Sequence, residues 1–490
     1  MGEQLTALDA TFLELEEADQ SAHMHIGGVI VLEPGPAGGA PPIAEIRRDV
    51  ASRLPDLPRY RQRLSSPRTG GLHWPTWEED REFRIERHVC RAGLPAPGGL
   101  EELCEWAGEH YSQRLDRTRP LWEMTILELA DGRWAIVTKT HHCMVDGVGS
   151  VDIANTLLDS EPSPRTGSAG VTGNGRPAGP GLSRSDVDRP TWRRAVERAS
   201  RPAIELGHAG VRAAETGLHV AESIVGVAAH PNRARDALHR SRALAELLLR
   251  DEVISAPESS LNRPIGAKRR LAVIGVELEE LKGIRGVLGG TVNDVVLAAA
   301  AGGLRKLLLD REEEPPPQGL RAMVPMNVRT AGERLAMGNR ISSLFVHLPV
   351  SADDPGSRYR LQVEEAESLK SGTQHEGSSL LLNVGNHMPP VLHSFMARSL
   401  FATRLFNVTI TNVPGPQIPL YYFGSRVQEI WPLVPIAAEH AVGLAVFSYD
   451  GTLFFCVNAD RDTVEDLDVL MKGIAESVAE LRELAAARVA

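Results

Sequence analysis

A chain of 490 residues can bury a large core and is expected to form two domains of about 200 residues each. With 42% hydrophobic and 24% charged residues it has the composition of an ordinary soluble globular protein, and a net charge of −11 argues against a nucleic-acid binder. The four cysteines lack paired spacing, which indicates a reducing compartment and no disulfide framework.

Membrane and secretion signals are absent from the amino-acid pattern. The first 20 residues are acidic and have neither the basic nor the apolar region of a secretory signal, so none is predicted. No apolar run approaches the roughly 18 residues that a spanning helix needs. We therefore expect any membrane contact to be peripheral.

The first predicted elements are a helix at residues 5–17 and a strand at residues 24–32. Apolar residues recur in the helix at near-helical spacing, with Thr6 and Asp9 as early capping residues. The strand has β-branched composition and ends before a Pro-Gly-Pro turn. Glu16, at the end of the helix, is either a solvated charge or part of a site.

An amphipathic helix at residues 42–54 and a strand at residues 83–89 are predicted next. Between them lie three arginines, Arg59, Arg61 and Arg63, at alternate positions. Such a cluster can bind an anionic ligand such as a phosphate, but alternating charges on an exposed strand are more often simply solvated.

A further helix is predicted at residues 100–115, followed by a strand at residues 122–129. Pro120 ends the helix and sets up the extended start of the strand. An Asp-Gly turn then joins this strand to the next one as a hairpin. Pro120, Leu121 and Trp122 are therefore predicted to be a packing element rather than a catalytic one.

The strand that follows carries the candidate catalytic group. Residues 134–141 alternate at the two-residue period of a strand, and an apolar helix pattern begins after Gly147. His142 thus lies at or just beyond a strand end, where α/β proteins place reactive groups. Its imidazole can take a proton and return it near neutral pH, so we predict a general base. Asp146 could fix the loop, and Gly147 allows the positive φ of a sharp turn.

Three other interpretations of this segment stay open. Adjacent strand residues point to opposite faces, so one of His141 and His142 is expected to be structural. A metal site could use a histidine with Asp146, but no HxxxH, HxH or CxxC spacing lies nearby, and no metal is predicted. Cys143 could be a nucleophile, although a lone loop cysteine is more often inert.

The middle of the chain is predicted to connect two domains. Residues 160–190 are rich in Gly, Pro and Ser and indicate a flexible linker. Residues 191–250 are predicted to be helical and carry ten arginines against six acidic residues, a balance of +4. This segment could lie on a lipid surface, or it could be a linker helix packed across both domains with a solvated basic side.

The second domain contains a helix that begins near Asn293. Thr291 or Asn293 can cap this helix, with Val295 and Val296 on its buried side. At a helix start, Asn293 and Asp294 could donate to an oxyanion or orient a substrate carbonyl, although capping alone explains both residues equally well. The remaining elements predicted are strands at 270–277, 320–328, 341–350 and 406–416, a helix at 388–406, a hairpin of 443–448 with 453–458, and a helix at 462–488.

Five segments, in order along the chain, resemble a known family. The run from His141 to Gly147 matches the HHxxxDG motif of the CoA-dependent acyltransferase superfamily. The opening LDATFLELEEADQSAHMHIGGVIVLE resembles the start of the wax ester synthase/diacylglycerol acyltransferase family, with Glu16 at its glutamate position. The Pro-Leu-Trp run, the segment that begins Asn293-Asp294 and the strand ending in TNVPGP resemble three further motifs of that family.

The resemblance implies an α/β fold of two chloramphenicol-acetyltransferase-like domains, at residues 1–159 and 261–490. Each would be a mixed sheet with flanking helices, residues 160–260 would connect them, and the active site would lie in a tunnel at their interface. It further implies transfer of a long-chain acyl group from acyl-CoA to diacylglycerol or a fatty alcohol, without metal or bound cofactor.

The site residues implied by the resemblance follow its motifs. His142 would be the base, beside His141, Asp146 and Gly147 of the same motif, and an arginine would pair with the aspartate. Asn293, Asp294 and Glu16 would bind the substrate or the oxyanion. Either Arg329 or Arg340 could be the partner of Asp146.

Two alternative functions remain. The chain could be a condensation-type or polyketide-associated acyltransferase that uses a carrier-protein thioester, or a lipid-surface binding protein without chemistry. The expected location is cytoplasmic, with peripheral attachment to the inner membrane face or to lipid droplets as one option.

Overall fold

The computed structural model describes residues 3–65, 74–144, 157–162, 256–327, 341–371 and 405–489. Predictions for Asp146 and Gly147, for Arg329 and Arg340, for the linker and basic segment at 163–250, and for most of the helix at 388–406 lie outside the described residues. Residues Met1–Pro164 and Ser255–Ala490 form one compact unit.

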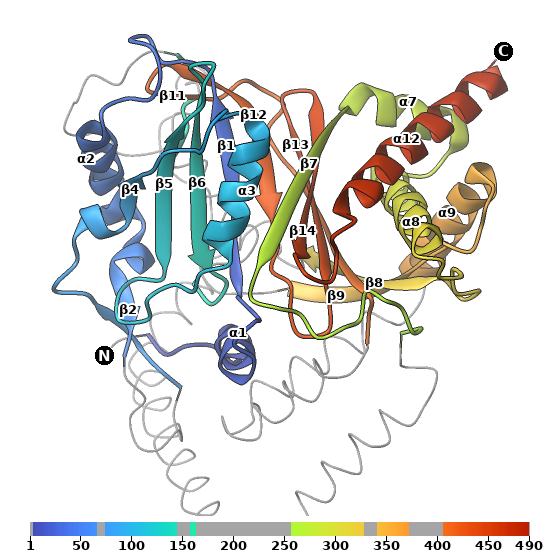
Figure 1. Ribbon diagram of the computed structural model, residues 1–490, viewed down its shortest axis with the longest axis horizontal. Helices are drawn as coiled ribbons and strands as arrows, with labels where there is room; N and C mark the ends of the chain where they lie inside the picture. Colours follow the sequence, from blue (N-terminus) through green and yellow to red (C-terminus); the bar gives the residue numbers. More distant parts are fainter. Residues whose placement is uncertain are drawn as a thin grey trace, which may run out of the picture. The chain divides into compact units, whose positions relative to one another are not determined.

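The first sheet has six strands in the order β11-β12-β1-β6-β5-β4 (Figure 1). All neighbours are antiparallel except β4 and β5, which are parallel. Two strands come from the C-terminal part of the chain, because β12 pairs with β1 along its length. The strands are β1 (His25–Leu32), β4 (Val89–Arg91), β5 (Trp122–Glu128), β6 (Trp134–His141), β11 (Tyr421–Tyr422) and β12 (Ser425–Leu433).

The second sheet also has six strands, in the order β7-β14-β13-β10-β8-β9. Strand β10 runs parallel to both of its neighbours, and the other pairs are antiparallel. Both sheets are therefore mixed, as expected from the resemblance. The strands are β7 (Arg269–Glu277), β8 (Leu320–Asn327), β9 (Ile341–Leu348), β10 (Val408–Pro414), β13 (Val442–Tyr449) and β14 (Thr452–Asp460).

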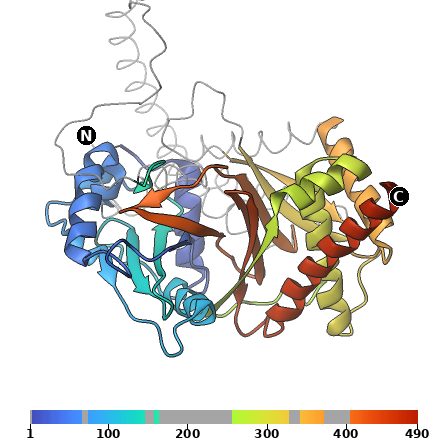
Figure 2. The same ribbon diagram turned by 90° about the horizontal axis from the view of Figure 1, so that it is seen from above.

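Four helices pack with the second sheet around one hydrophobic core. They are α7 (Leu278–Leu288), α8 (Val292–Asp310), α9 (Pro355–Ser371) and α12 (Leu467–Val489). Figure 2 shows α12, in red, lying across the yellow-green helices. The contact is close because α8 has glycine there: a β-carbon on Gly303 would lie 2.9 Å from the backbone nitrogen of Ile474. The sequence analysis predicted α8 and α12 but missed α7 and α9.

No single helix in the described part of the chain is long and apolar enough to cross a membrane. Only α7 and α8 taken together meet that length and composition, and they are bent by 99° at the break between them.

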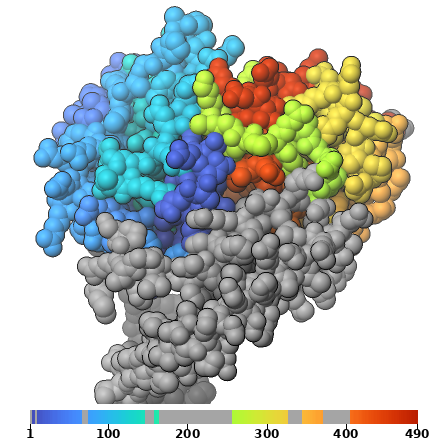
Figure 3. Space-filling model, turned by 60° about the horizontal axis from the view of Figure 1, so that its bottom comes forward, coloured from blue at the N-terminus to red at the C-terminus, as the bar shows by residue number. Residues whose placement is uncertain are grey.

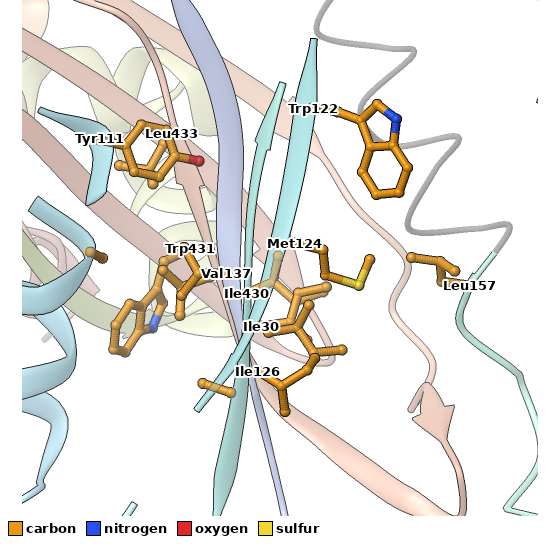
Figure 4. Close-up of a cluster of buried hydrophobic side chains, with 14 of the residues drawn as sticks. Ile30, Tyr111, Trp122, Met124, Ile126, Val137, Leu157, Ile430, Trp431 and Leu433 are labelled. Carbon is orange, nitrogen blue, oxygen red and sulfur yellow. The ribbon is translucent and has the colours of Figure 1, made fainter. Parts of the chain in front are cut away.

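The first sheet is buried on both faces. Figure 4 shows Trp122 and Met124 on one side of the central strands, with Tyr111 and Trp431 on the other. All four side chains belong to one hydrophobic core. The helices of this part are α1 (Ala7–Ala18), α2 (Ile43–Arg53) and α3 (Leu100–Tyr111), with 3-10 turns at Leu54–Asp56, Pro58–Arg61 and Ile85–Arg87 and a small sheet of β2 (Gln62–Leu64) and β3 (Trp77–Glu79).

Two predicted elements differ from the structure. The strand predicted at residues 83–89 is wrong, because Asp80 accepts the amide hydrogens of Glu82 and Phe83 and starts a turn, and pairing begins only at Val89. The helix predicted at residues 100–115 ends at Tyr111. There the Lys139 ammonium donates to the carbonyl oxygens of His110 and Gln113, at 2.9 and 3.2 Å, which satisfies groups that a longer helix would bond internally.

Candidate active site

His142 is the first residue after β6, as predicted. Its backbone N–H donates to the carbonyl of Met24, just before β1, at 2.8 Å. Its ring stacks on that of Phe12 in α1, with centroids 3.9 Å apart and ring planes at 15°. The position of His142 is therefore fixed by a backbone hydrogen bond and by a ring contact.

Burial decides the protonation state of His142. Loss of hydration lowers the pKa of His142 to about 4, and the nearby His141 acts in the same direction. The imidazole is consequently neutral near pH 7. A neutral ring is the form that can accept a proton.

His141 faces a different set of partners and is only 1% exposed. Its Nδ1 accepts the backbone N–H of Cys143 at 3.1 Å, so the ring proton belongs on Nε2. That Nε2 lies 3.4 Å from Oε2 of Glu16. The two neighbouring histidines thus have different surroundings: His141 lies in a buried polar cluster with Glu16, and His142 lies against Phe12. One of the two was expected to be structural, and the contacts of His141 fit that role.

Glu16 is a buried carboxylate, with 2% of its surface exposed. Its oxygens lie 2.6 Å from Nη2 of Arg117 and 3.5 Å from Nε2 of His25. Burial opposes ionisation, but the hydrogen bond and charge of His141, together with His25 and Arg117, hold the pKa of Glu16 well below its usual range. The interpretation of Glu16 as a solvated helix-end charge is therefore wrong.

The register of β1 against β6 brings this cluster together. His25 pairs with His141 at the same end of both strands. Two positions later the strands approach so closely that a β-carbon on Gly27 would lie 2.1 Å from the carbonyl oxygen of Thr138. Figure 3 shows the N-terminal segment, in dark blue, beside the orange C-terminal residues. Ala437 of the C-terminal part packs against the cluster of Leu15, Ala22 and Met24.

The Pro-Leu-Trp run supports the strand that ends in the histidines. The carbonyl of Leu121 accepts the backbone N–H of His141 at 2.9 Å. The indole of Trp122 donates to the carbonyl of Tyr60 at 2.8 Å and stacks on His88, with centroids 4.7 Å apart. These contacts are those of a packing element, as predicted from the sequence.

Asn293 and Asp294 lie at the start of α8. The carboxylate of Asp294 accepts the N–H and the hydroxyl of Thr291, at 2.7 and 2.8 Å, and the Asp294 N–H donates back to that hydroxyl. Thr291 and Asp294 therefore form a capping box. Asn293 instead accepts a hydrogen bond at Oδ1 from Nδ2 of Asn412, at 3.1 Å, which joins two of the motifs that the sequence analysis had noted separately.

The three arginines, for which an anion site was the less favoured interpretation, are each paired with a glutamate. Arg59 is buried, lies 2.7 Å from Glu3 and covers the ring of Trp77. The other two pair across the small sheet of β2 and β3, Arg61 with Glu79 at 3.2 Å and Arg63 with Glu78 at 3.0 Å. Their charges are neutralised locally, which disfavours the phosphate interpretation.

The thiol of Cys143 lies in an environment that makes it unreactive. The side chain is 2% exposed, and burial raises the pKa of its thiol well above the usual value. A protonated, buried thiol is a poor nucleophile. Among the described residues, no group of three His, Cys, Asp or Glu side chains is arranged to hold a metal ion.

Three residues of this cluster were missed by the sequence analysis. Phe12 and Arg117 gave no local signal, because their partners lie about a hundred residues or more away in the chain. His25 belongs to the MHIGG segment that carried the resemblance, but its role could not be read from that pattern alone. The sequence-predicted Asp146 and Gly147 lie outside the described residues.

Comparison with known proteins decides the family. The family model of the wax ester synthase/diacylglycerol acyltransferase catalytic domain matches residues 5–296, and that of the WS/DGAT C-terminal domain matches residues 337–482. The chain belongs to this family. As a member of the wax ester synthase/diacylglycerol acyltransferases, it is an acyltransferase.

Relatives and solved structures agree with this assignment. A probable diacylglycerol O-acyltransferase of Mycobacterium tuberculosis is 32% identical over 481 residues, covering 97% of this chain and 95% of the relative. The wax ester synthase/diacylglycerol acyltransferase of Marinobacter aquaeolei VT8 shares the fold with a TM-score of 0.66 at 24% identity, covering 99% of this chain and 100% of that one. The starter condensation domain of rhizomide synthetase, solved with C8-CoA and Leu-SNAC, also shares it, with a TM-score of 0.58 at 15% identity and coverage of 99% and 94%.

Proposed function

We propose that the protein transfers a long-chain acyl group from acyl-CoA to the hydroxyl of diacylglycerol or of a fatty alcohol. The products are triacylglycerol or a wax ester, together with free CoA. The observation that carries this proposal is His142, a neutral imidazole held at the end of β6 within the HHxxxDG motif. The similarity to the mycobacterial relative, a probable diacylglycerol O-acyltransferase, supports the diacylglycerol acceptor.

The reaction requires one proton transfer in each direction. His142 takes the hydroxyl proton as the oxygen attacks the thioester carbon, and a tetrahedral oxyanion forms. When the carbon–sulfur bond breaks, the imidazolium returns the proton to the departing thiolate of CoA. The imidazole ends neutral and ready for another cycle, so no bound cofactor takes part in this scheme.

Asn293 is our candidate donor to the oxyanion. Its bond from Asn412 occupies the acceptor end of the side-chain amide, and this makes Nδ2 the end that can donate. A fixed donor stabilises charge that develops only in the transition state. Asp294 has a carboxylate already engaged in the helix cap, so we assign it to shaping that helix start rather than to the oxyanion.

The other residues of the motif complete the proposal. Glu16 and His141 act on the geometry of the turn rather than on the substrate, because both are buried against each other. Asp146 would fix the loop by pairing with Arg329 or Arg340, and Gly147 would permit its sharp bend.

We further propose two acyltransferase-like domains, at residues 1–159 and 261–490, joined by the connector at 160–260, with substrates meeting in a tunnel at their interface. Because the acceptors are lipids, the protein would work in the cytoplasm at the inner membrane face or at lipid droplets, with residues 191–250 as the attachment segment.

The test is a product assay with purified protein. Labelled palmitoyl-CoA is incubated with dioleoylglycerol or hexadecanol, and neutral lipids are separated. We expect labelled triacylglycerol or wax ester, and a fall in kcat of about 10²- to 10⁴-fold for His142→Ala. His347→Ala is the matched control, since that histidine is 44% exposed and pairs with Glu365.

Three results would redirect the proposal. Retention of most activity by His142→Ala would remove His142 as the base. Transfer from a palmitoyl carrier-protein thioester, but not from palmitoyl-CoA, would favour a condensation-type enzyme. Absence of any transfer, with binding to lipid vesicles retained, would leave a lipid-surface protein.

A further inference from the structure

We propose that Arg117 and His25 are positioning residues of this active site. They hold the Glu16 carboxylate, Glu16 orients His141, and the ring of His141 fixes the turn that carries His142. The inference rests on the proposed function, because its purpose is to keep the base in place.

The first link is the charge of Glu16. A carboxylate that is 2% exposed is costly unless a cation compensates it. Arg117 supplies that cation, with Nη2 at 2.6 Å from Glu16 and Nη1 at 2.7 Å from Glu17. This guanidinium thereby bridges two successive carboxylates at the end of α1 and ties α1 to the loop that follows α3.

His25 closes the other side of the same carboxylate. Its Nε2 lies 3.5 Å from Oε1 of Glu16, and the ring is 1% exposed. Burial lowers the pKa of His25 well below its usual value, so the ring is neutral and presents a dipole, not a second charge. The cluster keeps one carboxylate opposite one guanidinium, with the neutral ring of His25 beside them.

The second link is the tautomer of His141. A proton on Nε2 faces the Glu16 oxygen at 3.4 Å, and Nδ1 is then unprotonated. Nδ1 is the atom that accepts the backbone N–H of Cys143 at 3.1 Å. A side chain that accepts an amide hydrogen two residues further on sets the direction of the turn, as an aspartate does in an Asx turn. If Glu16 loses its charge, the preference for this tautomer weakens.

The third link is the position of His142 between its neighbours. Phe12 and Glu16 are four residues apart in α1 and so lie on the same helix face. Phe12 stacks on His142, and Glu16 faces His141. One face of α1 therefore contacts both histidines. The ion pair of Glu16 with Arg117 helps to fix the orientation of that face.

The prediction on pH depends on every charged or titratable group around Glu16. His141 on β6, His25 on β1 and Arg117 after α3 contact its carboxylate, and Arg114 donates to its backbone carbonyl. His23, Lys139 and Cys143 interact with it electrostatically. Of these, Arg117 contributes the full positive charge in direct contact. Its removal should therefore let Glu16 take up a proton at a higher pH than in the natural protein.

The test compares Arg117→Met with Arg117→Lys in the full-length protein. For Arg117→Met we expect kcat to fall by about 10- to 100-fold, with little change in KM, because a displaced base reacts slowly while the substrate contacts remain. The acidic limb of the kcat profile should move to higher pH. Arg117→Lys restores the charge and should recover most of the kcat and the original limb.

Three further variants make the comparison specific. Arg119→Met is the matched control. Arg119 lies two residues after Arg117 in the chain and pairs with Asp116 at the surface, so this variant should leave kcat and its pH profile unchanged. His25→Leu should lower kcat in the same way as Arg117→Met, and His25→Gln, which keeps a donor, should lower it less.

The outcomes separate this inference from the proposed function. Suppose that His142→Ala is inactive, but Arg117→Met and His25→Leu have the same kcat and pH profile as the control Arg119→Met. The positioning role is then overturned, and His142 is retained as the base. If His142→Ala is active, the base fails and positioning is read from ¹⁵N NMR of histidine-labelled protein. The His141 ring signals must then change in Arg117→Met, and unchanged signals overturn the inference.

Discussion

The ring of Phe12 lies against the imidazole of His142, 3.9 Å away and tilted by only 15°. The contact joins the first helix of the chain to the end of β6. It removes one face of the imidazole from water, which favours the neutral ring. An apolar residue in α1 thus helps to set the chemistry of a histidine 130 positions later.

The pH dependence of catalysis should report this burial. Because the pKa of His142 is lowered from 6.5 to about 4, we expect kcat/KM to stay level through pH 6 and to fall only on approaching pH 4. Phe12→Ala should expose the ring and move this limb toward 6.5, while Phe12→Leu should move it less. The measurement is kcat/KM against pH in initial-rate assays, and a natural-protein limb centred near 6.5 would contradict the argument.

Stability should also fall as the solution becomes acidic. Six described histidines have pKa values lowered mainly by burial, so between their folded and unfolded values the unfolded chain binds protons that the native protein does not. Below about pH 6.5, each such group therefore reduces the free energy of unfolding by about 1.4 kcal/mol per pH unit, until its folded pKa is reached. The six are His23, His25, His88, His110, His142 and His440.

Thermal unfolding between pH 7.5 and pH 4.5 measures this effect. His110→Gln should show a shallower loss of Tm with acid than the natural protein. The pKa of His110 is lowered from 6.5 to about 3, so its contribution extends from about pH 6.5 down to the acidic end of the range. Equal slopes for the two proteins would show that His110 does not take part.

The start of α8 offers a test that separates capping from catalysis. Asn293→Ala should lower kcat by about 10²- to 10³-fold, as expected when an oxyanion donor is lost, with little change in stability. Thr291→Ala removes the cap and should cost about 1 kcal/mol of unfolding free energy, with kcat nearly unchanged. Urea unfolding and kcat are measured for both, and an active Asn293→Ala would remove Asn293 as the donor.

Trp122 should contribute to stability rather than to chemistry. Its side chain is 4% exposed, stacks on His88 and donates to the Tyr60 carbonyl. Trp122→Ala should therefore cost about 3–5 kcal/mol in urea unfolding. Trp122→Phe keeps most of the apolar contact and should cost less, mainly the lost hydrogen bond of about 1 kcal/mol. An alanine variant as stable as the natural protein would exclude a packing role.

Local patterns were sufficient for many elements of this fold. The period-two alternation placed β6 correctly up to His141, and the Asp-Gly turn before it forms the predicted hairpin. Thr6 and Thr291 cap the helices that their positions indicated. Such features depend on bonds between residues a few positions apart, and they can therefore be read from the sequence.

Pairings between distant segments were beyond that reading. The alternation of β1 does not say that β12, almost four hundred residues later, will lie beside it and complete its sheet. Neither β11 nor β12 was predicted, although the two strands pair with each other across a short turn. The packing of whole sheets decides which strands lie side by side. The residues of one strand do not identify its partner.

The sequence by itself thus determined which residues are candidates for the site: an imidazole at a strand end, a glutamate in the first helix and an asparagine at a helix start. Only the tertiary structure decided how these groups are used. Glu16 is an ordinary acid in the sequence. In the fold it becomes a buried partner of His141, and His141, His25 and Arg117 hold its pKa well below the usual range although burial alone opposes ionisation. Charge state and orientation depend on burial and on distant neighbours, and both of these exist only after the chain has folded.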